Sequence, residues 1–176
     1  MTWQDGYLRQ AESDYSIYSD LNKRRAPLCH RLHYLQMASE KLAKSFLCHG
    51  RHKPYKKTHY ALVRFLNSTK GHPSIPRLLG YSKNRLAYCA YIDSILDVAK
   101  RIENLAPAGG VYDKFNPEYP WKDIFGKIQV PADYPFIEFA VTDFAKIQTL
   151  MTSLFRIAGG LKFFPETGKN ISKIVL

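Results

Sequence analysis

Apolar residues recur at intervals of three and four along five segments of the chain, which is the pattern of helices that bury one face. The pattern predicts helices at residues 3–21, 27–48, 59–68, 86–102 and 137–158, in that order. Pro27 suits the first turn of the second helix, and Thr58 and Ser82 are expected N-caps of the third and fourth. In the fifth segment the apolar residues follow a nearly strict heptad, which suits a seam between helices or a dimer contact, and Gly159-Gly160 is expected to end it.

Residues 106–135 interrupt the helical pattern and are dense in proline, glycine and aromatic residues. A loop of this length inside a compact domain usually packs through its own side chains or has a role. The sequence therefore predicts an all-α protein, an up-and-down bundle of about five helices with this loop before the last one. We expect one domain over residues 1–160 and a short tail over 161–176, because 176 residues suffice for a single core.

The positive charge of the chain is concentrated between residues 22 and 72, which we call the basic stretch. It holds twelve basic residues and one acid, Glu40, so its net charge equals the +11 of the whole chain, and all six histidines lie in it. The remainder of the chain holds 14 basic and 14 acidic residues. Such segregation favours a polyanionic partner such as nucleic acid, a nucleotide, an acidic protein or anionic lipid, although a basic surface that serves only solubility is the alternative.

Three widely spaced cysteines lie in apolar helical segments, so we expect reduced, buried thiols. Cys/His spacings typical of zinc sites do not occur, and neither a metal nor a cofactor is predicted. The most apolar segment, 136–158, is interrupted by Glu138, Asp143 and Lys146, which favours a core helix over a membrane span. The polar N-terminus lacks the apolar core of a signal peptide, so the expected location is the cytoplasm.

Four spaced segments resemble the HEPN family (higher eukaryotes and prokaryotes nucleotide-binding). They are Trp3 with AESD at 11–14, CHRLHYLQMASEKLAKSFL at 29–47, THYALVRFL at 58–66 and NPEYPW at 116–121. Members typically show a Gln-Ala-Ala-Glu-Lys-like core in the second helix and a Thr-His-Asp-Leu-like start to the third. The resemblance implies an all-α bundle, commonly a homodimer. It also implies one of three functions: a metal-independent ribonuclease, a toxin paired with a nucleotidyltransferase-type antitoxin, or a non-catalytic binder of nucleotide or RNA.

The ribonucleases of this family typically carry an arginine followed four to six residues later by a histidine, usually late in the bundle. The histidine can move the proton of a 2′-hydroxyl while the arginine stabilises the charge on phosphorus. Here only Arg24 or Arg25 with His30 fit that spacing, and no histidine follows His72. We therefore expect a non-catalytic nucleotide or RNA binder. The alternatives are a ribonuclease that uses Arg25 and His30, and an interaction protein whose acidic, nucleotidyltransferase-type partner covers the basic stretch.

Several basic residues and one aromatic residue are candidates for the binding surface. In the loop 51–57, basic residues alternate with Tyr55, a mixture that suits phosphate contacts together with stacking of a base. Lys41 and Lys44 lie on the polar face of the second helix, where Glu40 and Lys44 also form an i,i+4 pair. The predicted nucleotide- or RNA-binding residues are Arg24, Arg31, Lys41, Lys44, Arg51, Lys53, Tyr55, Lys56 and Lys57.

Overall fold

The computed structural model describes residues 1–49, 51–55, 58–82, 84–107, 116–137, 139 and 141–161. Helices account for most of the described chain: α1 (Trp3–Lys23), α2 (Leu28–Leu47), α3 (Ala61–Lys70), α4 (Ile75–Leu78), α5 (Arg85–Glu103) and α6 (Val141–Leu161). A two-stranded sheet, β1 (Trp121–Lys122) and β2 (Ile128–Gln129), lies between α5 and α6 in the sequence. The predicted all-α bundle is confirmed, while the tail at 162–176 lies outside the described residues.

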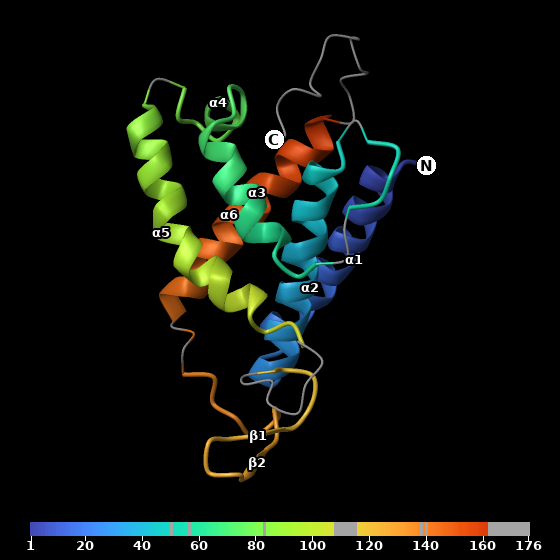
Figure 1. The fold of residues 1–176 in the computed structure, drawn as a ribbon, viewed down its shortest axis with the longest axis vertical. Helices are drawn as coiled ribbons and strands as arrows, with labels where there is room; N and C mark the ends of the chain where they lie inside the picture. Colours follow the sequence, from blue (N-terminus) through green and yellow to red (C-terminus); the bar gives the residue numbers. More distant parts are fainter. Residues whose placement is uncertain are drawn as a thin grey trace.

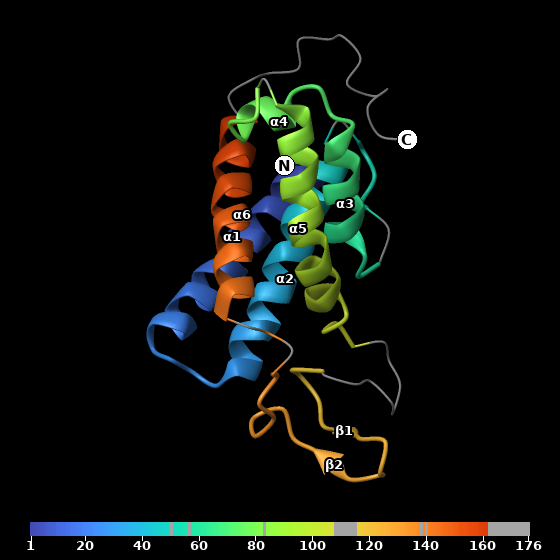
Figure 2. The same cartoon turned by 90° about the vertical axis from the view of Figure 1, so that its left-hand side faces the viewer.

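Helix α2 is the centre of the bundle. It contacts α1, α3, α5 and α6 (Figures 1 and 2), and α1 runs antiparallel to it along its whole length. Apolar residues from all five helices belong to one buried cluster. Of the described helices, none is both long enough and apolar enough to cross a membrane.

Local side-chain chemistry explains where several helices begin. Thr2 and Asp5 form a capping box at the start of α1. The side chain of Asn84 accepts a hydrogen bond from the backbone N–H of Ala87 and so caps α5, which corrects the expectation of Ser82. Helix α3 follows Tyr60 and has no side-chain cap of its own, so Thr58 is not its N-cap either.

The last helix begins later and ends later than predicted. Phe136 has a φ of 44°, in the left-handed region that no right-handed helix contains, and its side chain is fully buried. The helix therefore starts at Val141 rather than 137, and it continues through Gly159 and Gly160 to Leu161.

Part of the predicted long loop is a hairpin that projects beyond one end of the bundle (Figures 1 and 2). Trp121 pairs with Gln129 in antiparallel register. In the turn, the carboxylate of Asp123 accepts hydrogen bonds from the backbone N–H groups of Phe125 and Lys127. Trp121 itself is buried edge-on against Tyr134, with 5.0 Å between ring centroids. The aromatic residues that mark this segment in the sequence are thus what anchors it.

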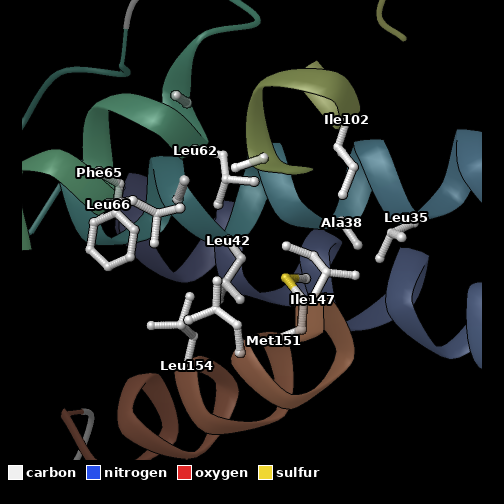
Figure 3. Close-up of a cluster of buried hydrophobic side chains, with 14 of the residues drawn as sticks. Leu35, Ala38, Leu42, Leu62, Phe65, Leu66, Ile102, Ile147, Met151 and Leu154 are labelled. Atoms are coloured by element: carbon white, nitrogen blue, oxygen red, sulfur yellow. The ribbon is translucent and has the colours of Figure 1, made fainter. Parts of the chain in front are cut away.

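Leu42 of α2 joins three helices in the core. Figure 3 shows it between Leu62 and Leu66 of α3 and Met151 and Leu154 of α6, all of them buried. The heptad residues of α6 that are described here face this core. The apolar seam of α6 is therefore internal to the bundle at these positions.

We predict that Leu42→Ala lowers the free energy of unfolding by about 2–5 kcal/mol, because it leaves a cavity among side chains of three helices. Leu86→Ala makes the same chemical change at a side chain that is 85% exposed and should cost less than about 0.5 kcal/mol. Urea unfolding followed by circular dichroism measures both. Equal losses in the two variants would contradict this packing.

Candidate nucleic-acid interface

Acidic residues neutralise the lysines in the middle of the basic stretch. Asp14 of α1 lies 2.5 Å from the Nζ of Lys41, and its carboxylate is almost fully buried. Glu40 lies 2.5 Å from the Nζ of Lys44, an i,i+4 pair as predicted, but here both side chains are largely buried. Lys44 is only 8% exposed, so its predicted place on a solvent-facing surface is wrong. The Lys41–Asp14 pair joins α2 to α1, and the Lys44–Glu40 pair lies within α2, so neither lysine presents free charge.

Glu40 is the acid around which this polar cluster forms. Its Oε2 atom accepts a hydrogen bond from Gln36 Nε2 at 2.9 Å and lies 2.9 Å from Nδ1 of His59. Burial opposes ionisation of Glu40, but hydrogen bonds from Lys44 and His59 outweigh it and keep the pKa below its usual value. His59 is itself more than half exposed. The arrangement is a buried carboxylate that orients an accessible imidazole.

Glu103, the last residue of α5, caps the neighbouring helix α3. Its Oε1 atom accepts a hydrogen bond from the backbone N–H of Val63 at 2.9 Å, in the first turn of α3. Burial raises the pKa of Glu103 to about 7, opposed by hydrogen bonds from the N–H groups of Val63 and Leu62, and the charge of Glu40 raises it further. This carboxyl group therefore titrates near neutral pH.

The first group of exposed cations lies at the turn between α1 and α2. Arg24, Arg25 and His30 are exposed there, and Arg25 has a φ of 54°. Arg31 is half-buried, because its Nη1 donates to Asn22 Oδ1 at 3.1 Å and so ties the turn. Of the predicted catalytic pair, Arg25 lies in the turn and His30 in the first turn of α2, and both are exposed. Among the described contacts no hydrogen bond or ion pair joins the two.

The second group lies in the loop after α2, where Arg51, His52 and Lys53 are exposed. Tyr55 follows them but is buried, and its phenol oxygen accepts a hydrogen bond from Nη1 of Arg64 at 2.9 Å. Tyr55 therefore belongs to the core, and its predicted role as an exposed stacking platform is wrong. Lys56 and Lys57 lie outside the described residues.

An open cleft of about 460 Å³ separates this loop from the start of α1. The described residues that line it are Met1, Thr2, Trp3, Gly6, Arg51 and His52. A hydrogen bond of 2.9 Å between Gln4 and His49 fixes the end of α2 against the first turn of α1, beside the cleft. Trp3 is half-exposed, so the aromatic face available near the basic loop comes from α1 and not from Tyr55.

The two exposed groups lie at opposite ends of α2 (Figure 1). A helix of 20 residues spans about 30 Å. The lysines between the ends are paired and partly or fully buried. The described part of the basic stretch therefore presents two separate basic groups, and Arg64 of α3, which is exposed and hydrogen-bonded to Tyr55, lies with the second.

Sequence reasoning missed Trp3, Gly6, His59 and Glu103. Glu40 carried a usable signal, because it is the single acid of the basic stretch and a charge that isolated is a candidate for internal pairing. Glu103 carried none, since its partner Val63 is 40 positions away. No group of three metal-ligating side chains occurs among the residues that the structure describes, and all three cysteines are free thiols.

Comparison of the chain with protein-family models, with curated proteins and with solved structures finds no match.

We predict that Glu103→Gln raises the free energy of unfolding above that of the unchanged protein, and that it does so by more at pH 8 than at pH 5. The pKa of Glu103 is about 7 in the folded state and near 4.5 when unfolded, so its ionisation costs stability as pH rises through that window. Glutamine keeps an oxygen that can accept the Val63 N–H but has no charge to bury. The stability difference between variant and unchanged protein should grow by on the order of 2 kcal/mol from pH 5 to pH 8.

Urea unfolding at both pH values measures this difference. Burial lowers the pKa of His33 and of His72, so both histidines also titrate, but they are present in both proteins and cancel in the comparison. A difference that is the same at pH 5 and pH 8 would show that Glu103 does not carry this ionisation.

Proposed function

We propose that this protein is a non-catalytic, HEPN-like module that binds nucleotide or RNA through the exposed cations of its basic stretch. The observation that carries the proposal is the separation of these cations into paired and unpaired sets. Asp14 and Glu40 form ion pairs with Lys41 and Lys44 inside the bundle. Arg24, Arg25 and Arg51 are exposed and take part in no ion pair with the described residues. Exposed cations without acidic neighbours attract phosphate groups.

The HEPN-like part of the proposal is supported by the four sequence segments that resemble the family and by an α-helical bundle of the expected class. The same resemblance supports a homodimer and, as a second kind of partner, an acidic nucleotidyltransferase-type protein. Such a partner would compete with RNA for the same cations.

Binding of a short single-stranded RNA, measured by fluorescence anisotropy over a salt series, tests the proposal. We expect affinity to fall steeply with salt, since each phosphate contact to a single strand contributes about 0.7 to the log–log slope. The double variants Arg24→Ala/Arg25→Ala and Arg51→Ala/Lys53→Ala should each weaken binding and reduce the slope by up to about 1.4. Lys122→Ala/Lys127→Ala removes the same charge from the exposed hairpin and should bind as the unchanged protein does.

Absence of binding at low salt would overturn the proposal. Binding that does not respond to salt would do the same. If the hairpin variant lost as much affinity as the other two, net charge alone would explain the binding, and the basic stretch would have no special role.

RNA cleavage is the second candidate function, favoured by the exposure of Arg25 in the α1–α2 turn and of His30 at the start of α2. The imidazole of His59, oriented by Glu40, is an alternative general base. We expect purified protein to leave total RNA intact in the absence of metal. Should cleavage occur, comparing His30→Ala with His59→Ala identifies the base, and activity that survives in both variants would exclude these two histidines.

A further inference from the structure

The cleft between the first turn of α1 and the loop after α2 has the dimensions of a ligand site. Its volume of about 460 Å³ lies within the range of small-molecule pockets. One wall is helical and the other is the loop that carries Arg51 and His52. The hydrogen bond between Gln4 and His49 holds the two walls together before any ligand arrives.

The charge in the cleft comes from its loop wall. None of the described residues that line it is acidic. Asp5 lies close by in the sequence, but its carboxylate accepts hydrogen bonds from the backbone N–H and the hydroxyl of Thr2 in the capping box. Arg51 and His52 are exposed, so an anionic group in the cleft would meet their side chains.

The helical wall supplies an aromatic face and an open space. Trp3 is 50% exposed. Gly6 is one turn further along α1, and a Cβ atom placed there would meet nothing within 4 Å. Glycine inside a helix is less stable than alanine, and no close packing at this position requires it. Its effect is to leave this part of the cleft lining without a side chain.

We propose that this cleft binds one nucleotide unit, with its base stacked on Trp3 and its phosphate held by Arg51 and His52, in the space that Gly6 leaves open. The inference rests on the proposed function in that its ligand is nucleic acid or a nucleotide, and it assigns that ligand to one end of α2. A free mononucleotide and the terminal nucleotide of a single-stranded RNA present the same chemistry. A base on an aromatic face and a phosphate on adjacent cations together give more affinity than either half alone.

Nuclear magnetic resonance of the tryptophan indole N–H groups tests this directly, because the chain has two tryptophans. Trp121 is a buried residue of β1 in the hairpin, at the end of the bundle away from the cleft (Figure 1), and serves as the internal control. Titration with AMP should shift the Trp3 signal and leave the Trp121 signal in place. Adenosine and inorganic phosphate, tested separately, should each bind at least about tenfold more weakly than AMP.

Gly6→Leu and Gly6→Ala form the matched pair of variants. Leucine projects into the cleft where the nucleotide is proposed to lie and should weaken AMP binding by about tenfold or more, whereas alanine adds one methyl group to open space and should retain most of it. Both residues favour helix more than glycine does, so thermal unfolding should show α1 intact in each. Arg51→Ala should weaken AMP binding but leave adenosine binding unchanged.

Comparison of AMP with RNA oligomers that carry or lack a 5′-phosphate separates the two ligand sources. Salt-dependent RNA binding with no Trp3 shift, and with full affinity in Gly6→Leu, would overturn this inference and leave the proposed function standing. Adenosine that binds as tightly as AMP would overturn the phosphate contact. If neither AMP nor RNA binds, both proposals fall. A Trp3 shift with AMP, lost in Gly6→Leu, supports the site.

Discussion

The burial of α2 among four other helices is the constraint on which the rest of the structure depends. Eleven of its 20 residues are buried, and one of them is Lys44. A charge removed from water without a partner costs several kcal/mol, so a central helix that carries Glu40 and Lys44 folds only if each finds an opposite charge or a hydrogen bond. Glu40 meets that requirement for Lys44, and Gln36 and His59 satisfy what remains of the carboxylate.

The same constraint decides where the protein can present charge. Lys41 forms an ion pair with Asp14 of α1, and Lys44 forms one with Glu40, so the lysines in the middle of α2 are neutralised. Arg25 and Arg51 remain exposed where α2 begins and where it ends, and Arg64 of α3 is exposed beside Tyr55 of the loop after α2. The charge that looks continuous in the sequence is thus divided by the packing of one helix. Both candidate sites, the α1–α2 turn and the cleft beside Trp3, follow from that division.

The sequence predicts the helices well because each buries one face, and this periodicity needs no knowledge of its neighbours. Prediction from the sequence fails where a residue far away in the chain sets the boundary or the cap of a helix. The start of α6 depends on Phe136, whose backbone leaves the helical region while its ring packs with Trp121 and Tyr134. The cap of α3 is Glu103, whose carboxylate accepts a hydrogen bond from the backbone N–H of Val63, 40 residues away in the sequence. The Glu40–Lys44 pair follows from its i,i+4 spacing, but counting charges could not show that Lys41 would be paired, because Asp14 is 27 positions away.

The division of charge also limits what the net charge of +11 can do to a ligand. Electrostatic attraction between exposed groups is screened beyond about 10 Å at moderate salt, and the two basic ends are about 30 Å apart. A ligand the size of one nucleotide can therefore meet only one end at a time. For such a ligand the local arrangement of Trp3, Gly6 and Arg51 matters more than the total charge. A longer RNA strand that reaches both ends would add the second group of cations without any change in the cleft.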